Sequence, residues 1–291
     1  MVTFGPRFLA VDWGTTNRRT FLIEDGRIAH TERDDLGVTS TPDFAAEVAA
    51  IRRRLGDLPM LLAGMAGSNI GWRMAPYIPV PAGISDVAKA VLAIDDRTMI
   101  VPGLSVMADG RPDVMRGEEV QLLGAAIAGL VPDGALLVQP GTHSKWAEVK
   151  GERVTGFVTA MTGELFALLR AHGLLAAQLG GEVKLGDAFR AGLEEGRRRD
   201  LTATLFGIRA AKMLGLRDDA DAASYASGVL IGNDVAVRLH QSAYDTVHIL
   251  ADPALGSLYG AAIEAQGRAA RVVDSQLAFV AGIVAIARQL P

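Results

Sequence analysis

Two segments of this chain are weak copies of one another, and this duplication limits the folds that the chain can adopt. Residues 9–28 read LAVDWGTTNRRTFLIEDGRI, and residues 136–154 read LLVQPGTHSKWAEVKGERV. Each copy has an apolar strand, a Gly-Thr turn, a basic residue and a second strand, and then closes a hairpin at a glycine. Solenoid repeats recur about every 20–50 residues, so copies this far apart predict two duplicated half-domains.

Both Gly-Thr turns have the chemistry of phosphate-binding loops. Gly14 and Gly141 leave the backbone accessible to an anion, and the amides that follow can form a nest of N–H donors. Further donors and positive charges follow the two glycines: Thr15, Thr16, Asn17 and Arg18 in the first loop, and Thr142, His143, Ser144 and Lys145 in the second. A single Gly-Thr pair can simply end a strand, and His143 can equally make a structural hydrogen bond. The matched positions in both copies favour phosphate binding.

Composition excludes several classes of protein. The chain has 291 residues, of which 49% are hydrophobic, and its formal net charge is −4, so it can bury a large core and shows no basic nucleic-acid footprint. It has no cysteine, which excludes disulfides and thiolate chemistry. The longest stretch without a charged residue, 58–72, is too short to span a bilayer. We expect a soluble cytoplasmic protein without nucleic-acid or membrane partners; a homodimer is left open.

The order of predicted elements repeats like the motifs do. The first half reads as three strands (8–12, 19–24 and 27–34), helix 42–55, strand 60–64, an irregular segment 76–81, helix 86–94, strand 98–102 and helix 117–130. The second half reads as strands 135–139, 145–150 and 153–159, helix 164–172, helical runs 186–214 and 219–240, strand 247–251, and helices 255–266 and 276–289. This order predicts two α/β domains of mixed sheet, residues 1–128 and 129–291. The chain contains neither a G-x-G-x-x-G fingerprint nor a P-loop, so a nucleotide would have to use the paired loops.

These motifs resemble those of the sugar kinase, Hsp70 and actin superfamily. Within it, DWGTTNRR (12–19), AGMAGSNIGW (63–72), RGEEVQLLGA (116–125), QPGTHSKW (139–146), MTGELFALL (161–169) and ADPALGSLYGAA (251–262) look like the 2-dehydro-3-deoxygalactonokinase family. The likeness runs in order over nearly the whole chain. It implies two ribonuclease H-like domains with mixed sheets flanked by helices and a cleft between them, which is the actin-like ATPase fold.

The resemblance also implies an activity. A member of this family would be a phosphotransferase with an alcohol acceptor, using ATP and Mg²⁺ to phosphorylate the terminal 6-hydroxyl of 2-dehydro-3-deoxy-D-galactonate in galactonate catabolism. Two alternatives stay open: a kinase of another sugar acid or polyol, and an ATPase clamp of the Hsp70 or actin type.

Three carboxylates are candidates for the chemistry of such a kinase. Asp12 precedes the first loop, where it could hold Mg²⁺ through water or accept the hydroxyl proton. Glu118 and Glu119 begin an apolar helix, where acidic residues also serve as ordinary caps. In the related glycerol and xylulose kinases a Gly-Asp pair supplies the base, and Gly117-Glu118 matches it, so the resemblance favours Glu118.

Two further groups complete the expected site. A polar turn after strand 60–64, together with a nearby arginine, would bind the sugar acid, since guanidinium pairs with carboxylate: Gly67, Ser68, Asn69, Trp72 and Arg116. The resemblance places a second set around the adenosine: Gly228, Gly232, Gly256, Ser257 and Tyr259. As alternatives, Trp72 can plug the domain edge, and a G-x-x-x-G helix often serves close helix packing.

Overall fold

The chain packs into two compact units that are interleaved along the sequence. The computed structural model describes residues 4–198, 200–240 and 242–290. Unit 1 comprises Met1–Gly134, Ala147–Phe157 and Ser275–Pro291, and unit 2 comprises Ala135–Trp146 and Val158–Asp274. These units are defined by packing, whereas the expected domains 1–128 and 129–291 are defined by duplication, so that division stays a proposal.

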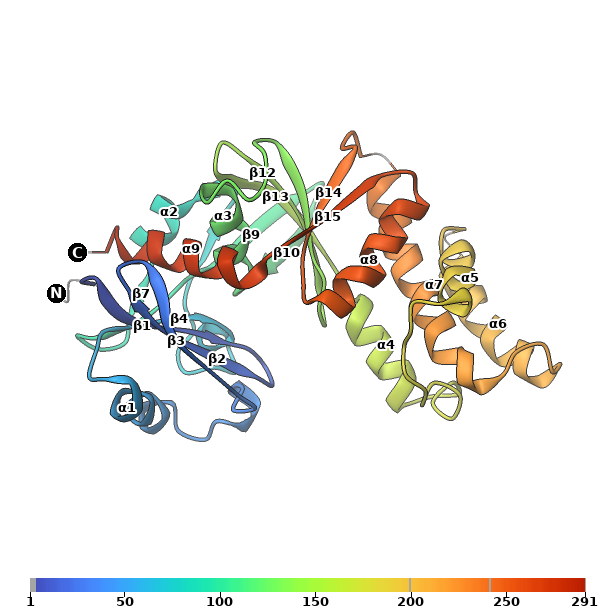
Figure 1. Cartoon of the computed structure of the whole chain (residues 1–291), viewed down its shortest axis with the longest axis horizontal. Coiled ribbons are helices and arrows are strands. Elements are labelled where there is room, and N and C mark those ends of the chain that lie inside the picture. Colours follow the sequence, from blue (N-terminus) through green and yellow to red (C-terminus); the bar gives the residue numbers. More distant parts are fainter. Residues whose placement is uncertain (1–3, 199, 241, 291) are drawn as a thin grey trace. The chain divides into compact units, whose positions relative to one another are not determined.

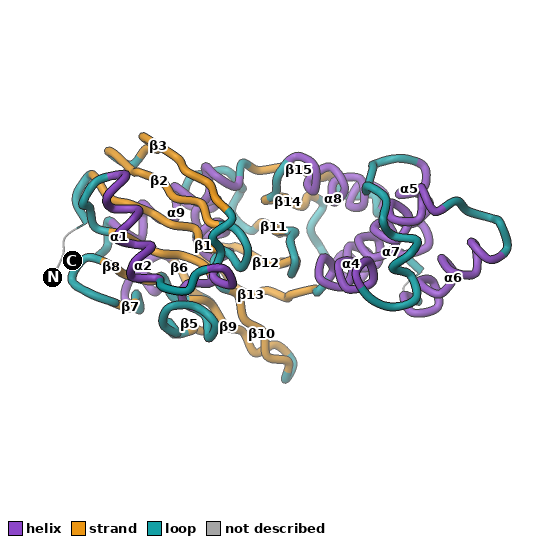
Figure 2. The backbone as a smooth tube through the Cα atoms, turned by 90° about the horizontal axis from the view of Figure 1, so that it is seen from below, coloured by secondary structure: helices purple, strands orange, loops and turns teal. Residues whose placement is uncertain are grey.

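The main sheet of unit 1 is mixed, and its centre is formed by two buried strands. The strand order is β3-β2-β1-β4-β8-β7, and Figure 2 shows β3, β2 and β1 side by side. The bounds are β1 Arg7–Trp13, β2 Arg18–Glu24, β3 Arg27–Asp34, β4 Met60–Gly64, β7 Leu92–Ala93 and β8 Thr98–Ile100. β1 runs antiparallel to β2 and parallel to β4, so the carboxyl ends of β1 and β4 meet at one edge of the sheet.

Helices of unit 1 cover this sheet. They are α1 Phe44–Leu55, α2 Ile84–Lys89, α3 Glu118–Ile127 and α9 Ser275–Ala287. The last of these follows unit 2 in sequence, yet it lies beside α3 (Figure 1). A side chain at Gly124 would overlap the carbonyl of Ala278, and one at Gly282 would overlap that of Val120. The two glycines therefore permit the close approach of α3 and α9.

A second, small sheet of unit 1 was not expected from the sequence. It has the order β10-β9-β5, with β5 Tyr77–Pro79, β9 Gly103–Ala108 and β10 Arg111–Met115. The expectation of an irregular segment at 76–81 is therefore wrong for its central residues, as is helix 86–94, because α2 ends at Lys89. These strands are short and partly exposed, so they lack the alternation of apolar residues that marks a longer strand.

Unit 2 combines parallel strands with most of the helices. β11 Ala135–Gln139 pairs in parallel with β14 Thr246–Leu250, which pairs in parallel with β15 Ala269–Val273, a strand that sequence reasoning missed. β12 Ser144–Lys150 and β13 Arg153–Ala160 contribute residues to both units. The helices are α4 Thr162–Ala171, α5 Asp187–Gly196, α6 Leu201–Met213, α7 Asp219–Leu239 and α8 Pro253–Ala265. The core is formed by side chains such as Val138, Trp146, Phe189, Ile249 and Ile263.

The expected α/β class with mixed sheets flanked by helices is confirmed. Among the described residues, no helix is both long and apolar enough to cross a membrane.

Candidate functional site

Asp12 lies at the carboxyl end of β1, beside the turn that follows β4. It is opposite Arg19 in β2 and Ala63 in β4. Although part of the residue is exposed, burial of its carboxyl group raises the pKa of Asp12 to about 6; Arg19 opposes this shift and Glu118 adds to it. The influence of Glu118 on the pKa of Asp12 indicates that these two candidate carboxylates face the same region.

The first Gly-Thr loop is a tight turn with its polar side chains exposed. The N–H of Gly14 donates to the carbonyl of Asn17 at 2.9 Å, and Thr15, Thr16 and Asn17 are exposed. Backbone bonds from Gly37 to Thr16 and from the following residues hold the turn from outside. The loop therefore offers exposed hydroxyl and amide groups on a fixed backbone.

Arg18, unlike the three residues before it, is buried. It is only 2% exposed, its Nη2 donates to Asp34 Oδ2 at 2.7 Å, and its Nη1 donates to Glu47 Oε2 at 3.0 Å. The guanidinium also lies over the ring of Trp13, 4.9 Å from the centroid. With two carboxylates already bound, Arg18 fastens β2 to β3 and α1, and we leave it out of the proposed phosphate site.

The two glutamates at the start of α3 have different surroundings. Glu118 is partly exposed, and its Oε2 accepts a hydrogen bond from the backbone N–H of Arg116 at 3.0 Å. Glu119 is fully buried; its Oε2 accepts from the N–H of Gly117 at 2.7 Å, and its Oε1 has no hydrogen-bond partner among the described residues. Burial, followed by the charge of Glu118, raises the pKa of Glu119 to about 8.

A left-handed glycine sets the direction of both glutamates. Gly117 has φ of 105°, and a side chain there would come within 3.1 Å of the Cα of Gly64, at the end of β4. Only glycine adopts this backbone conformation readily, so the α3 start can lie directly against the β4 turn.

Arg116 is a buried cation with unused donors. It is 7% exposed, its Nη2 donates to the carbonyl of Ala75 at 2.8 Å, and its guanidinium lies 4.3 Å from the centroid of the Tyr77 ring. Its Nε and Nη1 have no hydrogen-bond partner among the described residues. A side chain at Gly67 would come within 2.8 Å of Nη1, so the structure brings Arg116 and the Gly67 turn together as the sequence predicts.

The other members of the expected sugar-acid group divide between surface and interior. Asn69 is exposed, whereas Ser68 is buried and its Oγ accepts from the N–H of Ile70 at 3.3 Å. The partly buried Trp72 stacks on Phe44 at 6.2 Å between ring centroids. This contact favours the alternative in which Trp72 closes the edge of the core.

The second Gly-Thr loop is fastened to the first turn of α4. Gly141, Thr142 and His143 are exposed. The N–H of Glu164 donates to the carbonyl of Thr142 at 2.9 Å, and His143 Nε2 lies 2.6 Å from Glu164 Oε2. His143 thus has the structural hydrogen bond that the sequence left as its alternative role.

The next two residues point into unit 2. Ser144 is fully buried, and its Oγ lies 2.7 Å from the hydroxyl oxygen of Tyr259. Lys145 is 5% exposed, and its Nζ donates to Thr159 Oγ1 at 2.8 Å. The structure therefore separates Ser144 and Lys145 from the exposed part of the loop.

Most residues of the expected adenosine group lie in packed interfaces. Side chains at Gly228 and Gly232 would collide with Phe189 and Leu193 of α5, so these glycines allow α7 to pack closely on α5. Tyr259 is 1% exposed. Gly256 is buried in the first turns of α8, and only Ser257 is exposed. The helix-packing alternative accounts for the two α7 glycines.

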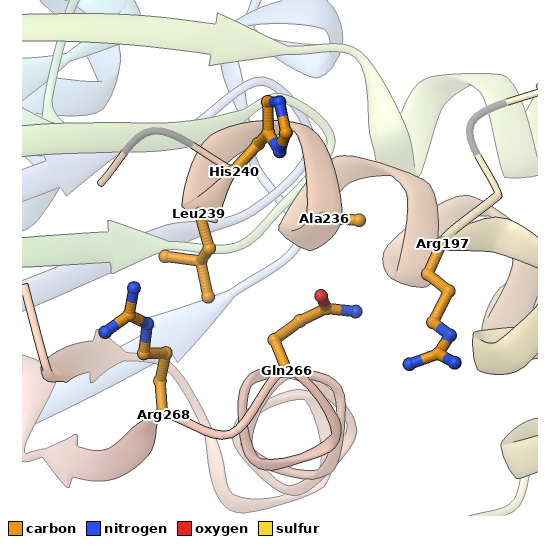
Figure 3. Close-up of a pocket in the computed structure, with 6 residues that line it drawn as sticks. All are labelled: Arg197, Ala236, Leu239, His240, Gln266 and Arg268. Carbon is orange, nitrogen blue, oxygen red and sulfur yellow. The ribbon is translucent and has the colours of Figure 1, made fainter. Parts of the chain in front are cut away.

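A pocket of about 290 Å³ in unit 2 is lined by none of the predicted site residues. It is lined by Arg197, Ala236, Leu239, His240, Gln266 and Arg268 (Figure 3). Both arginines already pair with carboxylates, Arg197 with Glu194 and Arg268 with Asp245. The pocket therefore does not add to the candidate site.

Asp12 is the candidate residue for a contact with a metal ion. Among the described residues, no group of three or more His, Asp or Glu side chains could hold one. Mg²⁺ in phosphoryl-transfer sites is commonly bound through one or two carboxylates plus substrate phosphates. Asp12 at the loop edge fits that limited role, since a cation nearby would offset the desolvation of its carboxylate.

Asp234 and Glu164 are polar residues of interest that sequence reasoning missed. Asp234 is 7% exposed, lies in the C-terminal part of α7 and accepts three side-chain hydrogen bonds. The available signal was an aspartate within the apolar run GVLIGNDVAV, because a lone carboxylate among buried residues needs partners.

Comparisons with known proteins identify relatives of this chain. A family model described as 2-keto-3-deoxy-galactonokinase matches residues 12–286. The 2-dehydro-3-deoxygalactonokinase of Escherichia coli (strain K12) is 38% identical over 288 residues, which cover 97% of each sequence. A crystal structure from Sinorhizobium meliloti, provisionally described as a 2-dehydro-3-deoxygalactonokinase, superposes with a TM-score of 0.90 at 38% identity and covers 97% of this chain and 98% of that chain.

A more distant structure shows the fold alone. Component A of the Acidaminococcus fermentans (R)-2-hydroxyglutaryl-CoA dehydratase has a TM-score of 0.53 at 14% identity, covering 98% of this chain and 97% of that chain. With such neighbours, the expected actin-like ATPase fold is confirmed.

Proposed function

The chain belongs to the 2-keto-3-deoxy-galactonokinase family, and on this basis we propose that it transfers a phosphoryl group from ATP to the terminal 6-hydroxyl of 2-dehydro-3-deoxy-D-galactonate. The product is the 6-phosphate of the sugar acid. ATP and sugar acids are cytoplasmic metabolites, so we also propose the cytoplasm as its location.

The observation that best supports an acidic substrate is the buried guanidinium of Arg116. A buried guanidinium with two N–H groups lacking partners is costly unless an anion binds there. A carboxylate fits because guanidinium can pair with it in a bidentate way. Gly67 packs closely beside the guanidinium, since a Cβ there would lie 2.8 Å from Nη1, so the backbone of the β4 turn lies next to the proposed contact.

The phosphoryl transfer would take place at the edge formed by β1, the β4 turn and the start of α3. Glu118 is the proposed proton acceptor for the sugar hydroxyl, because it is partly exposed and lies close enough to Asp12 to raise its pKa. Asp12 is the proposed partner of Mg²⁺ through water. Mg²⁺ would supply charge neutralisation at the phosphates.

Both Gly-Thr loops are proposed to bind phosphate groups of ATP. The exposed residues Thr15, Thr16 and Asn17 would serve the first loop, and Gly141 and Thr142 the second. Gly256 and Ser257 remain the proposed adenosine contacts.

A substrate panel tests the proposed activity. We expect ATP consumption with 2-dehydro-3-deoxy-D-galactonate and much less with neutral sugars or polyols. Turnover with a polyol and none with any sugar acid would contradict the proposed acceptor, and ATP hydrolysis independent of every acceptor would favour an ATPase clamp.

Variants of Arg116 test the carboxylate contact. Arg116→Gln should raise KM for the sugar acid about 10- to 100-fold, the range expected for a lost hydrogen bond to a charged group. KM for ATP should stay near the wild-type value. Arg53→Gln removes an exposed arginine of α1 and is the matched control. If Arg116→Gln raises KM equally for the substrate and for its amide analogue, Arg116 does not bind the carboxylate.

A further inference from the structure

Asp234 stands at the centre of a buried hydrogen-bond network that joins four elements of unit 2. Its Oδ1 accepts from Trp146 Nε1 of β12 at 3.1 Å. Its Oδ2 accepts from Thr162 Oγ1, the first residue of α4, at 2.9 Å, and from the Tyr259 hydroxyl of α8 at 3.0 Å. Asp234 itself lies on α7.

The network reaches the second Gly-Thr loop from two sides. On one side, Tyr259 contacts Ser144, which directly follows the exposed loop residues. On the other side, Thr162 begins the α4 turn to which Thr142 is bonded through Glu164. A side chain at Gly163 would overlap the carbonyl of Gly141, so this turn packs directly on the loop.

The direction of the hydrogen bonds fixes the role of Ser144. Tyr259 has one hydroxyl proton and donates it to Asp234, so the bond between Tyr259 and Ser144 must be donated by Ser144. The Ser144 hydroxyl is therefore committed inward and is not a donor for a phosphate group. This differs from the donor role that the sequence predicts for Ser144.

Stability alone does not explain why a carboxylate joins these four elements. Desolvation of Asp234 is unfavourable and raises its pKa, although the Thr162, Tyr259 and Trp146 hydrogen bonds oppose the rise. Apolar side chains of similar volume would often pack with equal or greater stability. What the hydrogen bonds add is directional control of Ser144 and Thr162, the two residues that flank the exposed loop.

We propose that Asp234 is a positioning residue for nucleotide binding, which acts through Tyr259, Ser144 and Thr162 to hold the second Gly-Thr loop in its binding conformation. The inference rests on the proposed function, in which this loop binds phosphate groups of ATP. Asp234 itself touches neither substrate.

Asp234→Asn is the principal test because it preserves size while it replaces an acceptor with a donor. Its Oδ1 can still accept from Trp146, but its amide must donate to Tyr259 and Thr162, which reverses the bond to Ser144. We expect the Kd of a non-hydrolysable ATP analogue, measured by calorimetry, to rise about tenfold. KM for the sugar acid should change less than twofold, and the far-UV circular dichroism should match the wild type.

Conservative pairs separate positioning from folding. Thr162→Val removes the hydroxyl with little change in volume and should weaken binding of the ATP analogue. Thr162→Ser keeps the hydroxyl and should retain the wild-type affinity. Ser224→Ala is the matched control: Ser224 lies on the same helix, is buried, and its hydroxyl bonds to backbone atoms of residues 182 and 184. It should lower Tm without changing the Kd.

Two outcomes would overturn the proposal. One is an analogue Kd within twofold of wild type in both Asp234→Asn and Thr162→Val. The other is a parallel loss in Ser224→Ala, which would show that any destabilisation of α7 weakens nucleotide binding. A wild-type protein that binds the analogue but phosphorylates no sugar acid contradicts the proposed acceptor alone, and the titrations still decide the role of Asp234.

Discussion

Glu118 and Glu119 are adjacent in sequence, but their environments suit them to opposite tasks. A residue with a carboxyl pKa of about 8 is mostly protonated at neutral pH, so Glu119 is a poor proton acceptor there. Its bond to the N–H of Gly117 instead supports the turn that presents its neighbour. Glu118 is partly exposed, and its charge contributes to the raised pKa of Asp12. It is therefore the better candidate for the base.

Glu118→Gln should therefore lower kcat by about 10²-fold or more, the usual size of a general-base contribution. Affinity for ATP should remain, because the change leaves both loops intact. Asp12→Asn should instead raise the Mg²⁺ concentration needed for half-maximal rate. Steady-state kinetics at varied Mg²⁺ would distinguish the two.

The matched control is Glu119→Gln, which can still accept from Gly117 and should retain most activity. If Glu119→Gln is inactive while Glu118→Gln works normally, the assignment of the base is wrong. If both work, Asp12 becomes the leading proton acceptor.

The raised pKa of Glu119 also predicts how stability depends on pH. Its pKa is about 8 in the folded chain, against the ordinary value of 4.5 that it regains on unfolding, so between these values the folded state holds the proton more tightly than the unfolded state. The contribution of Glu119 to stability is thus full below pH 4.5 and is lost as the pH rises toward 8. The slope of this contribution is at most about 1.4 kcal/mol per pH unit.

Glu119→Gln should remove this slope. Denaturant unfolding at pH 5 and pH 8 should show a smaller loss of stability in the variant than in the wild type. An equal pH dependence in both chains would mean that Glu119 does not hold a proton in the folded state.

Sequence reasoning at this scale worked where charge and backbone position decide the outcome. Arg116 and Gly67 were placed in the same expected sugar-acid group and lie next to each other, and Asp12 lies near a strand end as expected. Arg18 and Tyr259 were expected to bind the nucleotide, but both are buried. Their hydrogen-bond partners, Asp34 and Glu47 for Arg18 and Asp234 for Tyr259, are distant in sequence. Nothing in a local motif shows that such a partner will hold the side chain inside.

At the scale of elements, the two Gly-Thr loops are alike in sequence but differ in the space around their glycines. A Cβ at Gly14 would lie 3.0 Å from the carbonyl oxygen of Asn17, within its own turn. At Gly141 the nearest such atom is the carbonyl oxygen of His143, at 3.9 Å. A side chain at Gly141 therefore tests access to the backbone with little strain.

Gly141→Val should abolish ATP binding measured by calorimetry while Tm stays near the wild-type value, because the side chain would occupy the anion's approach. Gly14→Val should also abolish binding, but with a lower Tm because its own turn must shift. Gly156→Val changes a partly exposed glycine with open space around its Cβ, and should bind ATP normally. Normal affinity in Gly141→Val would contradict the phosphate role of the second loop.

Element order was predictable where periodicity was strong. The expected β-β-β-α start and the long α7 helix are present. The small sheet β10-β9-β5 and strand β15 were missed, since their residues are largely exposed and gain pairing only from strands elsewhere in the chain.

At the scale of the whole molecule, duplication in the sequence and packing in the structure divide the chain differently. Helix α9 ends the second repeat but buries its side chains in unit 1, where Phe279 meets Phe21 at 5.3 Å between ring centroids. Sequence periodicity showed that residues 276–289 form an apolar helix. It could not show which sheet that helix covers, because a helix that is apolar on all sides has no preferred face.

Unit 1 should therefore fail to fold without α9. A chain that ends at residue 274 loses four fully buried side chains, Ala278, Phe279, Ile283 and Ile286. The three larger ones each contribute about 1.5–3 kcal/mol, a large share of the roughly 5–15 kcal/mol that stabilises a typical domain. We expect the truncated chain to lose sugar-acid binding, as measured by titration calorimetry. We also expect it to lose one cooperative unfolding transition in scanning calorimetry.

Point variants within α9 keep the chain complete and make this prediction sharper. Gly282→Leu would push the helix away from the Val120 carbonyl and should lower Tm by several degrees, whereas Leu277→Ala alters a half-exposed side chain on the same helix and should change Tm little. If the chain ending at residue 274 still unfolds cooperatively and binds the sugar acid, α9 is dispensable to unit 1. The boundary near residue 128 that the duplication predicts would then describe the folding units better than packing does.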